Sequence, residues 1–430
     1  MRLLYLTAGT GSFYCGTCLR DAALVQGLRA RGHDAMLAPL YLPLVLEGEV
    51  PAERLHMGGV NAYLAQTLRL PLPRFVQDWL DSPRLLSWAA SKNDMTGARK
   101  LGELTHAMLR GEHGSQAREI EKLLEWLRTL PRPDVVLLSN ALLLGLAPPL
   151  ERALGVPLLC TLHGEAPYLD ALREPWRSRA WTALGEGARS VRDFLAVSRY
   201  TGELMIERAG LARERVHVVP NGIDLTGFAP AAGPPDPPAI GFLARLCRDK
   251  GLVTLFEAFL ALKARPGLER LRLIAMGTAL KPDHALVAEL TARARAAGHG
   301  DAVEFHADVT RTKKIELLGR CTLFSVPATY GESFGLYLLE AWAMGLPVVQ
   351  PEHAAFPELV RDTGGGLLVR PDDVRALADG LGALLADPAR ARALGEAGRR
   401  AVHARYGADA MAREVERIAR ISAPALSAAR

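Results

Sequence analysis

The chain has 430 residues, 49% of them hydrophobic and 23% charged, which is enough for two or three domains with sizeable cores. Its 52 basic and 47 acidic residues leave a net charge of +5, too small to indicate a nucleic acid or an anionic membrane as partner. Five cysteines exclude a disulfide scaffold and favour a reducing compartment, so we expect a cytoplasmic protein.

The N-terminal segment predicts a βαβ unit rather than a signal peptide. A short apolar strand at Leu3–Thr7 is followed by a Gly-rich turn at 8–12 and a helix at about Cys15–Arg31. A second apolar strand is expected at Ala35–Leu40. Such a unit indicates a parallel sheet with helices on both faces.

The next part of the chain interrupts this alternation. Residues from about 43 to 130 lack strong strand patterns and carry helical stretches broken by prolines, which predicts a helical insertion. The apolar run at 141–150 is far shorter than the roughly 20 residues of a membrane-spanning helix. Further strands are expected at Val135–Leu138, Val156–Leu162, Phe194–Val197 and Val216–Val219.

A Pro-rich segment divides the chain. Ala229–Pro238 cannot form a helix or a central strand and is expected to be a linker between a domain over 1–225 and a domain over 226–405. Two α/β halves of this kind predict two Rossmann-like domains facing a cleft. In the second half, strands are expected at Ala239–Leu243, Leu271–Met276, Val303–His306, Leu323–Val326 and Pro347–Gln350.

Two glutamates in the second half are the strongest functional signal. Glu332 lies in a turn between glycines, and Glu340 follows eight positions later inside a very apolar helical stretch. A carboxylate in such surroundings needs a partner, which the hydroxyl pair of a ligand would supply. Amides at the helix start would suit phosphate oxygens. The candidate binding residues at this turn are Ser333, Phe334, Gly335 and Leu336.

A second basic motif precedes them, in the segment Gly241–Gly251. Arg245 offers a planar fork and Lys250 a point charge, and both suit a diphosphate. Gly251 allows close approach of the backbone.

Together these motifs resemble the retaining glycosyltransferases of family 4, which have the GT-B fold. The resemblance covers most of the second half: G-x-x-x-R-L-x-x-x-K-G, the E-x7-E element, A-x-G-x-P-V-V, and the segments 357–360 and 365–369. In the first half it is carried by 219–224, by the helix start at 198–200 and by the Gly-rich N-terminal turn.

The resemblance implies a role for each matching residue. Arg245 and Lys250 would stabilise the leaving diphosphate, Glu332 would lie by the donor sugar and Glu340 would bind the ribose hydroxyls. His163 would contact the sugar. The remaining candidates are Gly241 for the donor, and Gly9, Thr10, Gly11, Cys15, Cys18 and Glu165 for the acceptor or the phosphates.

The resemblance also implies the reaction. We expect a metal-independent, retaining transfer from a nucleotide sugar, with UDP favoured and ADP and GDP left open, to an acceptor that the sequence does not identify. The chain has no Asp-x-Asp element, and we expect no cofactor besides the nucleotide-sugar co-substrate. The C-terminal helix, in 406–430, would cross back to the first domain. Its amphipathic stretch Ala408–Ile421 also leaves a membrane-surface role open.

Several alternatives stay open. A nucleotide-sugar epimerase would turn over the donor without an acceptor, and a non-catalytic protein would bind it without releasing nucleotide. A Rossmann oxidoreductase is disfavoured because the N-terminal turn lacks the full G-x-G-x-x-G spacing. Cys15 and Cys18 form a Cys-x-x-Cys pair that either packs the loop or has a redox or acceptor-binding role. Arg20 and Asp21 either face the acceptor or form an outward ion pair, and the outward pair is favoured.

Overall fold

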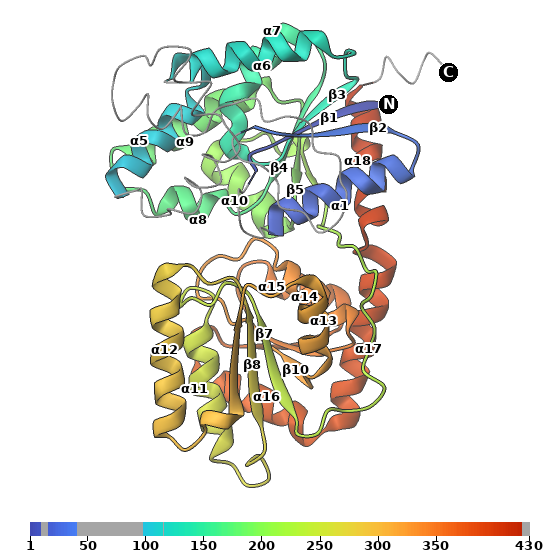
Figure 1. The fold of residues 1–430 in the computed structure, drawn as a ribbon. Coiled ribbons are helices and arrows are strands. Elements are labelled where there is room, and N and C mark those ends of the chain that lie inside the picture. The colour runs from blue at the N-terminus through green and yellow to red at the C-terminus, as the bar shows by residue number, and fades with distance from the viewer. Residues whose placement is uncertain (10–15, 41–97, 115, 424–430) are drawn as a thin grey trace. The chain divides into compact units, whose positions relative to one another are not determined.

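The computed structural model describes residues 1–9, 16–40, 98–114 and 116–423 (Figure 1). The chain divides into two compact units. Unit 1 comprises Met1–Pro220 and Met411–Arg430, and unit 2 comprises Asn221–Ala410. The boundary therefore falls before the Pro-rich segment 229–238, which forms neither helix nor strand in the structure and belongs to unit 2.

Unit 1 is built on a six-stranded parallel sheet in the order β2-β1-β3-β4-β5-β6. The expected alternation of strands and helices is confirmed. The strands are β1 Arg2–Thr7, β2 Asp34–Pro39, β3 Val135–Leu138, β4 Leu158–Leu162, β5 Asp193–Ala196 and β6 Val216–Val218. The helices are α1 Gly16–Ala30, α5 Ala98–Leu109, α6 Ala117–Thr129, α7 Ala147–Leu154, α8 Glu165–Asp170, α9 Trp176–Gly187, α10 Arg199–Ala209 and α18 Ala408–Ser422, with short 3-10 turns η1 Gly111–His113, η2 Ala141–Leu146, η3 Ala188–Ser190 and η4 Arg213–Arg215.

Side chains of β1 alternate between the two faces of this sheet, and each face has its own core. Leu4 and Leu6 belong to the core that includes residues of η2, α7 and α9. Leu3 and Tyr5 belong to the core that includes α1 and the apolar side of α18. The C-terminal helix is thus part of unit 1, and the apolar face that left a membrane-surface role open is buried against the sheet.

Unit 2 repeats the arrangement with the strand order β12-β11-β10-β7-β8-β9, again all parallel. The two sheets confirm the predicted α/β fold class. The strands are β7 Ala239–Leu243, β8 Arg272–Gly277, β9 Val303–Ala307, β10 Leu323–Phe324, β11 Val348–Pro351 and β12 Gly366–Val369. The helices are α11 Leu252–Lys263, α12 Lys281–Ala296, α13 Arg311–Gly319, α14 Leu336–Ala343, α15 Phe356–Thr363, α16 Val374–Ala386 and α17 Pro388–Arg405, with the 3-10 turn η5 Gly300–Ala302.

The strand order fixes where a ligand can bind in unit 2. The chain passes from β7 to β8 on one side, and β10 lies on the other side of β7. Ligands of open α/β sheets bind at the carboxyl ends of the strands where the order reverses. The loops that follow β7 and β10 carry the two motifs singled out in the sequence, so both motifs lie at this position.

Among the described helices, none is both long enough and apolar enough to span a bilayer.

Candidate functional site

The loops after β7 and β10 are joined by close backbone contact. The amide of Thr329 donates to the carbonyl oxygen of Asp249 (2.9 Å). Gly251 has φ +77°, and a Cβ at this position would lie 1.9 Å from the carbonyl oxygen of Pro327. Only glycine fits both the positive φ and the close approach. The glycine of the basic motif thus brings Lys250 next to the loop that carries Glu332.

Glu332 is buried, and the hydrogen bonds to its carboxylate all go to one of the two oxygens. Lys250 Nζ donates to Oε2 of Glu332 (2.6 Å). The hydroxyls of Tyr330 and Tyr337 donate to the same oxygen, each at 3.0 Å. Within the described residues, Oε1 receives no hydrogen bond. One oxygen is therefore held by the protein, and the other is available to a ligand.

The charges of this cluster keep Glu332 ionised. Burial raises the pKa of its carboxyl group, but the charge of Lys250 and the three hydrogen bonds outweigh burial and hold the pKa below its ordinary value. Burial and the neighbouring carboxylate raise the pKa of Tyr330 and Tyr337, so both hydroxyls stay protonated donors. Lys250 Nζ also lies 4.9 and 5.5 Å from the centres of these two rings.

Glu340 forms a second ion pair of the same kind. On α14 its Oε1 lies 2.6 Å from Nζ of Lys314, which belongs to α13. The sequence reasoning found Glu340 but missed Lys314, because one lysine of a Lys-Lys pair on a polar helix carries no distinguishing signal.

Arg245 is held by an acid that the sequence reasoning also missed. Its Nε lies 2.7 Å and its Nη2 3.2 Å from the two carboxylate oxygens of Asp283. The hydrogen bond with Asp283 raises the pKa of Arg245. Asp283 also accepts from the amide of Leu280 at the start of α12 (2.8 Å). Since 42% of the Arg245 side chain is exposed, the fixed guanidinium can still bind an anion.

The remaining donor candidates divide between the helix start and the strand. Gly335 has φ +87° and is the N-cap of α14, and Phe334 beside it is 2% exposed. The amide of Leu338 donates to the carbonyl oxygen of Gly335 (2.9 Å), whereas the amides of Leu336 and Tyr337 before it have no acceptor within the helix. Ser333 lies in the same turn. Gly241 lies inside β7, where a Cβ would be 2.8 Å from Sγ of Cys321, so its structural role is packing.

In unit 1, His163 and Glu165 lie after β4. Both oxygens of the buried Glu165 accept from backbone amides, those of Ala141 (2.8 Å) and His163 (2.6 Å). This carboxylate therefore fixes the loop that carries His163. Burial, together with the charge of Arg20, holds the pKa of His163 well below its ordinary value, so its ring is neutral at pH 7. Among the described residues, nothing bonds to its buried Nε2.

The outward ion pair expected of Arg20 and Asp21 is wrong. Both side chains are 0% exposed. Arg20 donates to the hydroxyl of Tyr5 (2.7 Å), which donates to Asp21 (2.7 Å), and Thr7 donates to the second oxygen of Asp21 (3.2 Å). The two charges can be buried because the hydroxyls of Tyr5 and Thr7, on the buried strand β1, form hydrogen bonds with them.

The N-terminal turn is described only in part. Gly9 has φ +79°, and Cys18 is buried on α1. Thr10, Gly11 and Cys15 lie outside the described residues, so the predictions for them stay predictions. Over the described ranges, no group of three or more His, Cys, Asp or Glu side chains could hold a metal ion.

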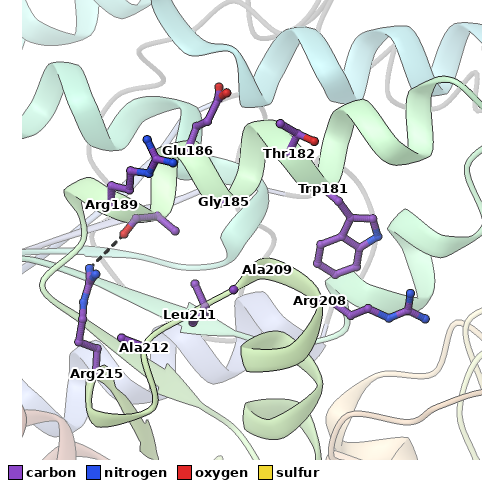
Figure 2. Close-up of a pocket in the computed structure, with 12 residues that line it drawn as sticks. Trp181, Thr182, Gly185, Glu186, Arg189, Arg208, Ala209, Leu211, Ala212 and Arg215 are labelled. Atoms are coloured by element: carbon purple, nitrogen blue, oxygen red, sulfur yellow. Dashed lines mark hydrogen bonds between the residues drawn. The ribbon is translucent and has the colours of Figure 1, made fainter.

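Unit 1 also has a pocket of about 520 Å³ that contains none of these candidates (Figure 2). It lies between the ends of α9 and α10, and Trp181, Arg208 and Arg215 are among its lining residues. Arg215 donates to the carbonyl oxygen of Ala188 (3.1 Å), the dashed line in Figure 2. Ala188 and Arg215 precede β5 and β6, so the pocket lies at the amino ends of the strands, away from His163.

Each unit contains a segment that matches a known protein family. Residues 228–401 match the family described as Glycosyl transferases group 1. Residues 101–226 match the family described as Glycosyltransferase Family 4.

Relatives of known activity support the same assignment. A D-inositol 3-phosphate glycosyltransferase of Xylanimonas cellulosilytica is 34% identical, over 59% of this chain and 64% of that protein. The alpha-maltose-1-phosphate synthase of Mycolicibacterium smegmatis is 34% identical, over 57% of this chain and 68% of its own length. A second D-inositol 3-phosphate glycosyltransferase, from Nocardia farcinica, is also 34% identical, over 44% of each chain. The chain thus spans less than two thirds of the length of these two D-inositol 3-phosphate glycosyltransferases (64% and 44%).

Solved structures share the fold. Sucrose-phosphate synthase from Thermosynechococcus elongatus has a TM-score of 0.73 at 21% identity, with all of both chains covered. HepE from Anabaena, solved in complex with UDP, has a TM-score of 0.68 at 18% identity, covering 97% of this chain and 99% of its own.

Proposed function

Because the chain belongs to the group 1 glycosyltransferases, we propose that it transfers a sugar from a nucleoside diphosphate sugar to an acceptor molecule. One observation carries the proposal. The loops after β7 and β10 place Lys250 against Glu332 at the carboxyl edge of the unit 2 sheet, where ligands of such sheets bind.

The chemistry of the side chains supports a role in breaking a sugar–diphosphate bond. Negative charge grows on the leaving diphosphate as that bond breaks, and fixed cations stabilise it. Lys250 and Arg245 are such cations, each oriented by a carboxylate. The first amides of α14 would add donors to the phosphate oxygens. These groups supply the charge stabilisation without a metal ion, so the proposed transfer is metal-independent.

The state of Glu332 argues for a retaining course. Its lowered pKa makes it a weak base, so it suits hydrogen bonding to the donor sugar better than proton abstraction. In the proposed step, the bond between the anomeric carbon and the phosphate oxygen breaks while the acceptor oxygen bonds to the same face of that carbon. The departing phosphate oxygen takes the acceptor's proton, and the donor's anomeric configuration is kept.

We propose a UDP-sugar as donor. HepE, which shares the fold, was solved with UDP and with UDP-glucose. One relative is named as GDP-mannose-dependent, so GDP and ADP sugars belong in the same screen. In unit 1, neutral His163 offers a polar ring nitrogen to a sugar hydroxyl. We assign the acceptor to unit 1.

The test is a thermal-shift screen with UDP-, GDP- and ADP-sugars in the presence of EDTA, using the wild type and Glu340→Ala. We expect one nucleotide class to raise the melting temperature of the wild type and to lose this effect in the variant. Turnover of that donor with candidate acceptors, followed by NMR, should give a product with the donor's anomeric configuration.

Three outcomes contradict parts of the proposal. Conversion of the donor into a second nucleotide sugar without an acceptor indicates an epimerase. Binding with no nucleotide release across a broad acceptor panel indicates a non-catalytic binding protein. An inverted product overturns the retaining course and leaves the transfer standing.

A further inference from the structure

The second glutamate of the cluster is held by a lysine that belongs to no sequence motif. Lys314 Nζ lies 2.6 Å from Oε1 of Glu340, and only 14% and 16% of the two side chains are exposed. From the part of the chain that the structure describes, Oε2 of Glu340 receives no hydrogen bond. As in Glu332, one oxygen is bound by the protein and the other is available to a ligand.

Lys314 lies on α13, and the start of this helix is held in place by contacts that do not involve Glu340. At its start, Arg311 donates to the carbonyl oxygens of Asp224 (3.0 Å) and Thr226 (2.8 Å). The Arg311 guanidinium also lies 5.0 Å from the ring centre of Phe228. Because Arg311 anchors the start of the helix, the position of Lys314 does not depend on its ion pair with Glu340 alone.

The partial burial of this pair is not explained by stability. Removing two charges from water offsets most of the attraction between them, so a buried ion pair contributes little to folding. The neighbouring Lys313 pairs with Glu316 on the surface, with 43% and 56% of the side chains exposed. The same helix thus carries one lysine in water and one facing the candidate nucleotide site.

Resting on the proposed function and on the ribose-binding role expected of Glu340, we propose that Lys314 is a specificity-determining residue that reads one ribose hydroxyl together with Glu340. An ammonium group only donates hydrogen bonds and an ionised carboxylate only accepts them, whereas a hydroxyl does both. One ribose hydroxyl donates to Oε2 of Glu340 while its oxygen accepts from a second N–H of Lys314. A nucleotide without this hydroxyl covers the pair and leaves both groups short of a partner.

The experiment measures the affinity of the full-length protein for UDP, 2′-deoxy-UDP and 3′-deoxy-UDP by calorimetry. We expect the wild type to bind UDP roughly 10- to 100-fold more tightly than one of the two deoxy compounds. In Lys314→Met the affinity for UDP should fall while that for the same deoxy compound changes little, so the ratio falls clearly below the wild-type value. Part of the ratio remains because Glu340 still accepts from the hydroxyl. Lys313→Met is the matched control and should keep the wild-type ratio.

Two further measurements separate the possible failures. Lys314→Arg keeps the charge and the donors, so it should restore part of the ratio, and circular dichroism checks that each variant is folded. If the wild type binds none of UDP, ADP and GDP, the proposed function fails and the inference fails with it. If a nucleoside diphosphate binds but the wild type does not discriminate its deoxy forms, or Lys314→Met keeps the ratio, only the role of Lys314 is overturned.

Discussion

Glu332 and Glu340 show how a folded chain can hold a carboxylate and still offer it to a ligand. In each, a lysine from another segment takes one oxygen, at 2.6 Å. The charge is thereby compensated within the protein, and the second oxygen keeps its capacity to accept. The two lysines differ in surroundings, since Lys250 also contacts two tyrosine rings.

Lys250→Met should make the stability of the protein depend on pH in a new way. Folded Glu332 has a pKa below its ordinary value of 4.5, so its charge stabilises the fold above that pH, and this contribution is lost as the pH falls through the folded pKa. Without Lys250 the buried charge has no cation, which costs about 3–5 kcal/mol at pH 7. Protonation removes that cost.

Urea unfolding of both proteins between pH 7 and about pH 4 measures this difference. We expect the gap between wild type and Lys250→Met to be largest at neutral pH and to narrow towards acid. Lys313→Met, which loses an exposed pair, should stay within about 0.5 kcal/mol of the wild type throughout. A gap that does not change with pH would show that Lys250 acts through packing alone.

Tyr337→Phe should separate the positioning of Glu332 from its charge. The variant loses one of three donors to Oε2 while Lys250 stays in place, so the free energy of unfolding should fall by about 1–2 kcal/mol. We expect UDP-sugar turnover (kcat) to fall about tenfold with a smaller change in KM, because the freed carboxylate rotates. Tyr168→Phe, which loses a hydroxyl contact with Thr105 in unit 1, is the control. Equal kinetic effects of both variants would contradict this role.

The helices and strands show how far the sequence predicts the structure. Apolar runs between helical stretches predicted the parallel strands because strands covered on both faces need continuous apolar sequence. Arg245 and Lys250 could be predicted as site residues because they lie in a spaced motif after a strand. The partners of Arg245 and Glu340 could not be predicted in this way, because Asp283 comes from α12 and Lys314 from α13, and only the packing of those helices brings them there. The ion pair of Arg20 and Asp21 was predicted, but its burial was not, since its partner Tyr5 lies on another element.

Helix α18 has one side in the core of unit 1 and another side in solvent. Ile418 is 1% exposed within the core on the sheet of unit 1, whereas Ile421 on the same helix is 57% exposed. Ile418→Ala should lower the free energy of unfolding by about 2–5 kcal/mol, because it leaves a cavity. Ile421→Ala should change it by less than about 0.5 kcal/mol. Chemical denaturation of both variants checks this, and equal effects would show that α18 is not packed on the sheet.

For the whole molecule, the division into units predicts where donor binding resides. Arg245, Lys250, Lys314, Glu332 and Glu340 all lie in unit 2, which has its own sheet and core. We therefore expect a fragment of residues 221–410 to bind the preferred nucleoside diphosphate within about tenfold of the full chain's affinity. Calorimetry measures it, with Glu340→Ala in the same fragment as control. A folded fragment that binds no nucleotide would show that unit 1 contributes to donor binding.

Unit 1 is formed by two segments of the chain, and unit 2 lies between them in the sequence. All six strands of its sheet are translated before unit 2, but α18, which covers one face of that sheet together with α1, is translated only after unit 2. Until then, the nascent sheet lacks the cover of α18 over apolar side chains such as Leu3 and Leu195 on that face. Nascent chains with such surfaces aggregate or are held by chaperones. Slow translation through unit 2 would lengthen that exposed period, so codon choice there should affect the yield of unit 1 as much as that of unit 2.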